Sequence, residues 1–382
     1  MSPAPVKVLF VMSDLNGGGA ERVVLTVSRC LDRARFEPSL FLLKKEGVYW
    51  DEVAPDMRVR YGMEESGRLR YRAFSVLRKL MAEASKNDVV VGTLELLPSY
   101  FAYLCGAISR KPVIAWVHAD LDRHLEIYGS VSIHRRVIKA LYPRFRKIVF
   151  PSLSARNSFL GLAPRVAGTT QVIYNPVDLK IVISKGTENL PEWAQTCFTK
   201  PVVVGVGTLA VAIKGFDLLI RAHAELLSRG VDHNLLILGE GSDRQLLERL
   251  AEEVGVSKSV FLPGFQENPY PFIRHACSLV MASRFEAFGM VVLEAMVLGV
   301  PVICLESASG AVEILDRGVY GICVSGEDPS ALASAMNAII TEPALHQLYS
   351  RLGKERVEFF QPEQIIHQWE QLLWNTGRSC SR

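Results

Sequence analysis

The sequence of 382 residues lacks the long hydrophobic runs and the paired cysteines that define several classes of protein. No run of about 18 apolar residues occurs, so we expect no transmembrane helix. Residues 1–11 form a short and poorly flanked apolar run, so we expect no signal peptide there. The seven cysteines are scattered and never spaced C-x-x-C, which predicts reduced thiols in a cytoplasmic protein and no zinc site.

A dinucleotide-binding fingerprint is missing as well. The buried-strand pattern of residues 6–12 is followed by Gly17-Gly18-Gly19, which are consecutive glycines instead of G-x-G-x-x-G. The next strand pattern, residues 39–43, ends without an acidic residue for a ribose. A nicotinamide dehydrogenase is therefore disfavoured. The glycines either form a simple tight turn or let a ligand approach the backbone.

Charge is distributed unevenly along the chain. Residues 1–180 contain 27 Lys and Arg against 17 Asp and Glu, and the remainder contains 16 against 23. A basic half indicates an anionic partner. Its basic residues cluster at 68–79 and 135–147 among aromatic and aliphatic residues, which fits either two solvated helix faces or a helix pair on anionic lipid. No nucleic-acid recognition motif accompanies them, so we expect no nucleic acid as partner.

Strand-like and helical patterns alternate through both halves of the chain, which predicts the α/β class. We expect one Rossmann-like domain over residues 1–180, completed by a C-terminal helix at 362–376. A second Rossmann-like domain is expected over 198–361. Residues 181–200 show little periodicity and contain a proline, so we interpret them as the connection between the domains.

The most informative stretch is residues 283–296. Its helical part, 290–298, is apolar almost all the way round and is therefore expected to be buried, although Glu294 lies in its middle. A buried carboxylate needs hydrogen-bond donors. Glu286 lies eight residues earlier, so the two carboxylates are at most about 12 Å apart.

That separation matches a nucleotide sugar measured from hexose to ribose. Each carboxylate suits a vicinal diol, and the N–H groups of a helix N-terminus between them suit a diphosphate. The spacing fits equally well a solvated Glu286 and a core Glu294 that is paired with a Lys or Arg.

The E-x7-E pattern of Glu286 and Glu294 resembles the signature of the GT-B glycosyltransferases, in particular the retaining family four. The resemblance extends to G-G-A-E-R at 18–22, N-P-V-D at 175–178, K-G-x-D at 214–217 and G-x-G at 239–241. It implies two Rossmann-like domains facing a central cleft. Thr208 departs from the family pattern, which usually has Arg there, so half of a cationic clamp is missing. Arg284 is a candidate replacement.

The resemblance also implies roles for individual residues. Glu286, Lys214 and His118 become the expected catalytic residues, although a lone histidine is more often structural and a lysine at a helix start is more often solvated. The N-termini of helices near Gly289 and Gly310 would face phosphate. The expected donor-binding residues are Gly18, Gly19, Gly207, Thr208, Gly239, Phe265, Phe288, Gly289, Met290, Val291 and Glu294.

A family member of this kind moves a hexose or N-acetylhexosamine from a nucleotide sugar, here expected to be a UDP sugar, with retention of configuration. The expected acceptor is a glycan or a polyprenyl-diphosphate-linked acceptor in envelope polysaccharide or lipopolysaccharide synthesis. We expect a cytoplasmic protein with peripheral contact with the anionic inner face of the plasma membrane.

We expect no metal and no other cofactor. The D-x-D of Asp120 and Asp122 is a weak metal signal, because that motif belongs to a single-domain architecture. A nucleotide-sugar epimerase and an inactive sugar-nucleotide-binding subunit remain as alternatives.

Overall fold

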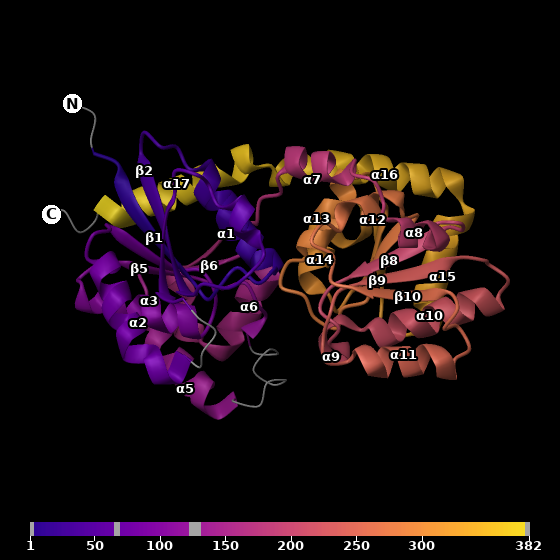
Figure 1. Cartoon of the computed structure of the whole chain (residues 1–382), viewed down its shortest axis with the longest axis horizontal. Helices are drawn as coiled ribbons and strands as arrows, with labels where there is room; N and C mark the ends of the chain where they lie inside the picture. Colours follow the sequence, from indigo (N-terminus) through magenta and orange to yellow (C-terminus); the bar gives the residue numbers. More distant parts are fainter. Residues whose placement is uncertain (1–3, 65–68, 122–130, 379–382) are drawn as a thin grey trace. The chain divides into compact units, whose positions relative to one another are not determined.

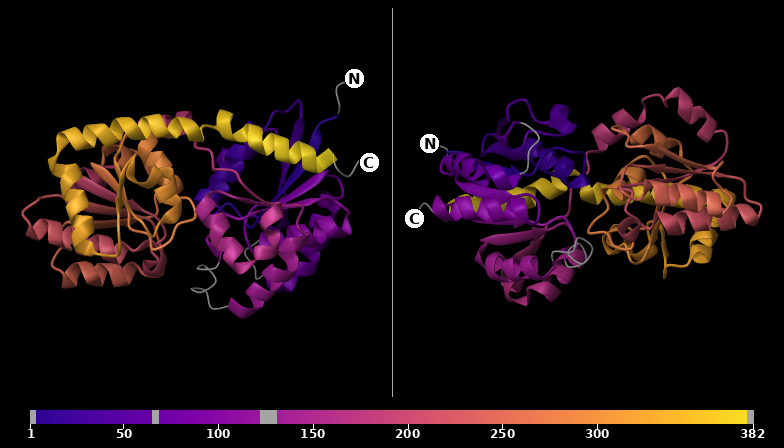
Figure 2. Two further views of the ribbon diagram at one scale, coloured as in Figure 1. Left: turned by 180° about the vertical axis from the view of Figure 1, so that it is seen from behind. Right: turned by 60° about the horizontal axis from the view of Figure 1, so that its bottom comes forward.

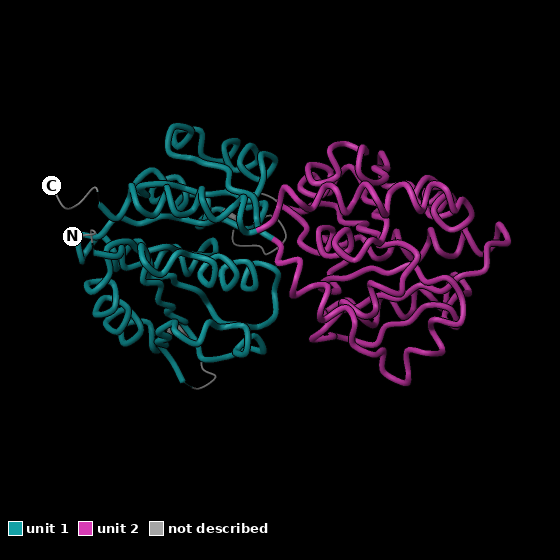
Figure 3. Tube along the Cα trace, turned by 90° about the horizontal axis from the view of Figure 1, so that it is seen from above, with its two compact units in different colours: residues 1–176, 362–382 teal, residues 177–361 magenta. Residues whose placement is uncertain are grey.

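The computed structural model describes residues 4–64, 69–121 and 131–378, and the chain divides into two compact units (Figures 1 and 3). Unit 1 contains Met1–Pro176 and Pro362–Arg382, and unit 2 contains Val177–Gln361. Each unit is a parallel β-sheet covered by helices, which confirms the predicted α/β class with two Rossmann-like domains. No helix in the described ranges has the length and apolar character needed to span a bilayer.

Unit 1 is built on a seven-stranded sheet in the order β3-β2-β1-β4-β5-β6-β7. Its strands are β1 (Val6–Met12), β2 (Phe36–Lys44), β3 (Arg58–Met63), β4 (Val89–Gly92), β5 (Val113–Trp116), β6 (Lys147–Phe150) and β7 (Thr170–Val172). Its helices are α1 (Gly19–Cys30), η1 (Tyr49–Glu52), α2 (Leu69–Ala84), α3 (Leu97–Ile108), α5 (Val131–Leu141), η2 (Tyr142–Arg144), α6 (Leu153–Leu162), η3 (Pro164–Thr169) and α17 (Pro362–Arg378).

Helices cover both faces of this sheet, which explains why β1 is apolar and buried along nearly its whole length. Right-handed crossovers place α1 on one face and α2, α3, α5 and α6 on the other. The C-terminal helix α17 contacts α1, β1 and β4 and so covers the α1 face (Figure 2). The ring of Trp369 in α17 lies 4.2 Å from that of Trp116 in β5.

Unit 2 is built on a six-stranded sheet in the order β10-β9-β8-β11-β12-β13. Its strands are β8 (Val202–Val206), β9 (Asn234–Leu238), β10 (Val260–Gly264), β11 (Ser278–Met281), β12 (Val302–Leu305) and β13 (Ile322–Val324). Its helices are α7 (Leu179–Gly186), α8 (Glu192–Cys197), α9 (Val211–Lys214), α10 (Phe216–Ser228), α11 (Arg244–Glu253), α12 (Tyr270–His275), α13 (Met290–Val297), α14 (Ser309–Ile314), η4 (Asp316–Gly318), α15 (Pro329–Thr341), α16 (Pro343–Val357) and η5 (Glu358–Phe360).

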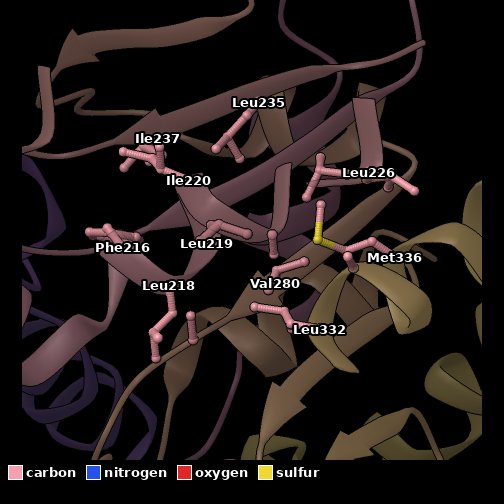
Figure 4. Packing of buried hydrophobic residues seen from close by; sticks show 14 of the residues in the cluster. Phe216, Leu218, Leu219, Ile220, Leu226, Leu235, Ile237, Val280, Leu332 and Met336 are labelled. Atoms are coloured by element: carbon pink, nitrogen blue, oxygen red, sulfur yellow. The ribbon is translucent and has the colours of Figure 1, made fainter. Parts of the chain in front are cut away.

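One hydrophobic core of unit 2 lies between the sheet and helices α10 and α15 (Figure 4). Phe216 and Leu219 from the first turns of α10 are at most 2% exposed there, in the same cluster as Val280 of β11 and Met336 of α15. This packing fixes the start of α10. Because α9 ends one residue before α10, the same packing limits where Lys214 can lie.

Residues 181–200, interpreted above as the connection between the domains, belong to unit 2. The chain forms α7 and α8 there. The side chain of Asp178 caps α7 by accepting a hydrogen bond from the N–H of Ile181 at 3.1 Å, and the ring of Trp193 in α8 stacks on Phe272. Helices of eight and six residues are too short to show a clear 3.6-residue period.

Candidate active site

Unit 2 has a topological switch point between β8 and β11. These strands are neighbours, but the connection from β8 leads to one side of the sheet and the connection from β11 to the other. Ligands of open α/β sheets bind where such connections diverge, beyond the carboxyl ends of the strands. The segment after β8 carries Gly207, Thr208 and Lys214, and the segment after β11 carries Glu286.

Lys214 and Glu286 meet at this switch point. The Nζ atom of Lys214 lies 2.6 Å from Oε2 of Glu286, and their side chains are 21% and 17% exposed. A charge-assisted hydrogen bond of this kind is about twice as strong as one between neutral groups. The structure therefore brings together two of the expected catalytic residues, 72 positions apart in sequence.

Arg284 holds the helix that carries Lys214. Its guanidinium donates two hydrogen bonds to Asp217, at 2.8 and 2.9 Å, and one to the carbonyl of Val211 at 2.6 Å. Its backbone N–H donates to the carbonyl of Ile213 at 2.8 Å, so that α9 is tied to the segment of Glu286.

Arg284 is therefore not a replacement for the arginine that Thr208 displaces. Its Nε also donates to Glu327 at 2.9 Å, so that carboxylates and a carbonyl of the protein occupy most of its donors. The sequence could not reveal this, because the partner of a basic side chain depends on the tertiary structure. Asp217 is the fourth residue of K-G-x-D, and this pairing gives it a structural role.

The loop after β8 packs closely against the turn after β9. Gly239 has a φ of +141°, and a Cβ atom there would lie 1.9 Å from the carbonyl oxygen of Gly207, so that only glycine fits. The N–H of Gly207 donates to the carbonyl of Leu238 at 3.0 Å, and the alkyl chain of Lys214 lies along Gly207. Thr208 is exposed beside them. Phe265, 45% exposed, follows β10.

Helix α13 begins at the same edge of the sheet. Gly289 precedes it with a φ of +93°, and the N–H groups of Met290 and Val291 are at the first turn, where a helix has no internal acceptors. Phe288 is 3% exposed and packs edge-on against Phe360. The start of α13 carries a partial positive charge, so this helix end is suitable for binding an anion.

Glu294 is buried in the middle of α13, as its apolar surroundings predict. It is 7% exposed, and its Oε1 accepts a hydrogen bond from the hydroxyl of Tyr270 in α12 at 3.0 Å. Tyr270 was not identified from the sequence. It lies in a short apolar helix, where nothing in the local pattern distinguishes it from a core tyrosine.

The N-terminus of α14, which was expected to face phosphate, has its Gly310 N–H paired within the protein. The N–H of Gly310 donates to the carbonyl of Glu286 at 2.9 Å, and a Cβ atom at Gly310 would lie 2.4 Å from the carbonyl of Ala287. This helix end instead fixes the backbone that carries Glu286, because only a glycine lets the two segments approach so closely.

In unit 1, His118 follows β5 at the carboxyl edge of the sheet. Its backbone N–H donates to Oε2 of Glu95 at 3.1 Å, and its ring lies 4.6 Å from that of Trp116. Burial lowers the pKa of His118 to about 3, so the ring is neutral at physiological pH. Within the described residues its buried Nε2 has no hydrogen-bond partner.

Gly18 and Gly19 form the start of α1 in the same unit. Gly18 is the N-cap residue, and the carboxylate of Glu21 accepts the N–H of Gly18 in the manner of a capping box. Burial raises the pKa of Glu21, and the nearby carboxylates of Asp14 and Glu95 raise it further. The backbone N–H of Gly18 is thus already hydrogen-bonded within the protein.

The described part of the chain contains no group of three or more His, Cys, Asp or Glu residues that could hold a metal ion. In the D-x-D of Asp120 and Asp122, which is a weak metal signal, Asp120 accepts a hydrogen bond from the hydroxyl of Ser158 at 2.6 Å. Asp122 lies outside the described residues.

Two family models match the chain, one in each half. Glycosyltransferase Family 4 matches residues 17–181, and Glycosyl transferases group 1 matches residues 196–356. The matches support a GT-B glycosyltransferase family. The first covers the glycine-rich loop and His118, and the second covers Lys214, Glu286 and Glu294.

Two proteins of similar sequence are glycosyltransferases. The chain is 25% identical over 369 residues to the N-acetylgalactosamine-N,N'-diacetylbacillosaminyl-diphospho-undecaprenol 4-alpha-N-acetylgalactosaminyltransferase of Campylobacter jejuni, covering 94% of this chain and 96% of that one. It is 35% identical over 174 residues to the lipopolysaccharide core biosynthesis glycosyltransferase LpsE of Rhizobium meliloti, covering 45% of this chain and 49% of that one.

The crystal structure of Anabaena HepE in complex with UDP and glucose has the same fold, with a TM-score of 0.81 and 21% identity. The match covers 96% of this chain and 99% of that one.

The arrangement in unit 2 combines groups whose chemistry suits a diphosphate with groups that suit sugar hydroxyls. One cation and the start of a helix supply positive potential, and two carboxylates flank them. Of the expected donor-binding residues in this unit, Gly207, Thr208, Gly239, Phe288, Gly289, Met290, Val291 and Glu294 all lie on or beside the loops and helices described above.

Proposed function

We propose that the protein is a retaining, metal-independent glycosyltransferase that moves a hexose or N-acetylhexosamine from a UDP sugar to a glycan or a polyprenyl-diphosphate-linked acceptor. The proposed setting is envelope polysaccharide or lipopolysaccharide synthesis at the inner face of the plasma membrane. The observation that carries the proposal is the 2.6 Å ion pair of Lys214 and Glu286 at the switch point of unit 2, beside the start of α13.

Lys214 would leave Glu286 and pair with the donor diphosphate when the donor binds. The N–H groups at the start of α13 would donate hydrogen bonds to the second phosphate, and together these groups would stabilise the charge that develops on the leaving diphosphate. This charge stabilisation is the role that a metal ion has in other transferases, which is why we propose a reaction without one.

Glu286 and Glu294 would bind hydroxyl groups of the donor. Glu286, freed from Lys214, would accept hydrogen bonds from the sugar, and Glu294 would accept them from the ribose while Tyr270 keeps it oriented. A carboxylate beside the sugar also stabilises an oxocarbenium-like transition state.

The proposed transfer takes place on one face of the sugar. The bond between the anomeric carbon and the phosphate oxygen breaks, and the bond to the acceptor oxygen forms on the same side. The acceptor proton passes to an oxygen of the leaving diphosphate. In unit 1, the neutral ring of His118 would hydrogen-bond the sugar or the acceptor without adding charge.

The proposal is tested by incubating the protein with a panel of nucleotide sugars and candidate acceptors while nucleotide release is followed. We expect release with one donor, the same rate in the presence of a chelator, and an α-linked product from an α-linked donor. Loss of activity on chelation would contradict the metal-free reaction. Conversion of the donor in the absence of any acceptor would indicate an epimerase instead.

A catalytically inactive sugar-nucleotide-binding subunit is the second candidate. One observation favours it: Thr208 supplies no charge, and Arg284 is committed to Asp217 and Glu327. Such a subunit would be stabilised by UDP or a UDP sugar but would release no nucleotide with any acceptor.

A further inference from the structure

Exposed apolar side chains of unit 1 are concentrated on three neighbouring helices. Of the eight large hydrophobic residues that are exposed in its described part, six lie on α2, α3 and α5. Their exposures reach 83% for Phe74, 74% for Tyr71 and 68% for Ile133. We call the outward surface of these helices the α2–α3–α5 face. Its exposed apolar residues are Tyr71, Phe74, Leu97, Leu104, Ile108 and Ile133.

The three helices lie in the same part of unit 1 (Figure 1), and α3 contacts both of the others. The thiol of Cys105 in α3 donates to the carbonyl of Leu77 in α2 at 3.7 Å, and Tyr100 in α3 stacks on His134 in α5 at 6.1 Å. Helix α3 therefore lies between α2 and α5. Leu97, Leu104 and Ile108 recur at helical spacing, so they form a stripe along its outer side.

This face carries cations between its apolar residues. Arg78 lies one turn after Phe74 on α2, and Arg136 lies one turn after Ile133 on α5. Both arginines are exposed, as are Arg72 and Lys139. The one acidic residue in the three helices, Glu83, is buried and paired with Arg58 and Lys86.

Alternation of cations and apolar side chains distinguishes a lipid surface from other partners. Protein–protein interfaces favour Arg and aromatic residues but are depleted of Lys, whereas this face also exposes Lys139 and has no exposed acidic residue on its three helices. Exposed Leu and Ile side chains contribute nothing to phosphate-backbone binding by nucleic-acid proteins. An anionic bilayer matches both components, because aromatic and aliphatic groups enter the headgroup region while Arg and Lys pair with lipid phosphates.

We propose that the α2–α3–α5 face docks on an anionic lipid bilayer. Arg72, Arg78, Arg136 and Lys139 contact lipid phosphates, and Tyr71, Phe74 and Ile133 enter the interfacial region. The biological consequence rests on the proposed function. Leu97, at the start of the apolar stripe, is two residues after Glu95, whose carboxylate binds the backbone of His118. A lipid-linked acceptor that stays in the bilayer would thus present its head group to the edge that carries His118.

Co-sedimentation of the full chain with vesicles tests the docking face. The vesicles contain phosphatidylcholine alone or equal parts of phosphatidylcholine and phosphatidylglycerol, at low and high salt. We expect binding to the anionic vesicles, weaker binding at high salt, and at least about tenfold less to neutral vesicles. A double variant Arg78→Glu/Arg136→Glu should lose at least about tenfold in binding, and Tyr71→Ser/Phe74→Ser should lose a similar factor because two aromatic anchors are removed.

Matched controls come from unit 2. Phe359 is 63% exposed and Lys258 is exposed, so Phe359→Ser and Lys258→Glu make single changes of the same two kinds elsewhere. Equal binding to neutral and anionic vesicles by the wild type, or an equal loss in the control variants, would overturn the proposal. Retention of a UDP-induced rise in Tm by the docking variants shows that the fold and the donor site are intact.

Failure of the docking proposal and failure of the proposed function give different results. If the face does not bind lipid, the anionic vesicles do not sediment the protein even though nucleotide release in solution is normal. If the chain is not a transferase, no donor gives nucleotide release even though the wild type binds anionic vesicles and the docking variants do not.

Discussion

The two units have the same architecture but differ in the chemistry at the carboxyl edge of their sheets. In unit 2, ionised side chains meet there, and Arg284 ties the two loops together through Asp217 and the backbone of α9. In unit 1, the corresponding edge carries a neutral histidine and a glutamate whose pKa is raised by burial. Binding a diphosphate requires fixed positive charge, whereas contact with neutral hydroxyl groups does not. The difference fits a donor site in unit 2 and an acceptor edge in unit 1.

Glu286→Gln separates binding from turnover in unit 2 and has the largest expected effect. The amide keeps the shape but loses the charge, so nucleotide release should fall about 10²- to 10³-fold. UDP should bind at least as tightly as before, because Lys214 is no longer paired. Steady-state rates and UDP titration measure the two effects, with Glu252→Gln on the exposed side of α11 as control. A parallel loss of UDP binding would contradict the assignment of Glu286 to the sugar.

Arg284→Lys tests whether α9 must be fixed for Lys214 to act. Lysine keeps the charge but cannot make the bidentate contact with Asp217. We expect KM for the donor to rise about tenfold, with a smaller fall in kcat, since a misplaced Lys214 still carries its charge. Asp217→Asn should give the same pattern. A change in Tm with unaltered KM would show that the network serves stability alone.

Thr208→Arg should restore the second cation at the exposed loop after β8. A bidentate contact with phosphate contributes roughly 1–2 kcal/mol, so we expect KM for the donor to fall several-fold. Thr208→Lys should give a smaller gain, and Thr208→Ser serves as the neutral control. Unchanged donor affinity in the arginine variant would indicate that this loop does not face the diphosphate.

His118 makes unit 1 sensitive to acid. Its pKa is about 3 in the folded state, below the ordinary value of 6.5, so the unfolded chain binds more protons between these limits. Stability is therefore fully present above pH 6.5 and is lost as pH falls below it, by at most about 1.4 kcal/mol per pH unit. Chemical denaturation from pH 7 to 5 should show a shallower loss for His118→Gln. Because the ring stays neutral, it should add no pKa between 5 and 8 to the pH profile of turnover.

Tyr270→Phe has the smallest expected effect. It removes the hydroxyl that donates to Glu294 and should lower the free energy of unfolding by about 1 kcal/mol. Donor affinity should fall less than in Arg284→Lys, since Glu294 itself remains. Denaturant titration and donor KM measure both quantities. Unchanged stability would contradict the assigned hydrogen bond, because the substitution keeps the ring and removes only the hydroxyl.

The sequence predicted the fold well because its signals are local. Apolar strands, glycine turns and helix periods alternate clearly, and the all-round apolar character of α13 predicted a buried Glu294. The partners of the side chains were not predictable. Arg284 was a candidate replacement for the missing arginine at position 208, yet Asp217 binds it from a helix start 67 residues away in sequence. Gly310 was expected to face phosphate, yet its N–H binds the carbonyl of Glu286. Such pairings depend on which loops meet in the folded chain.

The central claim is that Lys214 exchanges its partner Glu286 for the diphosphate of a nucleotide sugar. Calorimetric titration of UDP into the wild type, Lys214→Ala and the exposed control Lys258→Ala tests it most directly. The account predicts that Lys214→Ala weakens UDP binding by at least about tenfold, the loss expected for one charge-assisted contact, while Lys258→Ala binds as the wild type does. Equal affinity for UDP in all three proteins would contradict it.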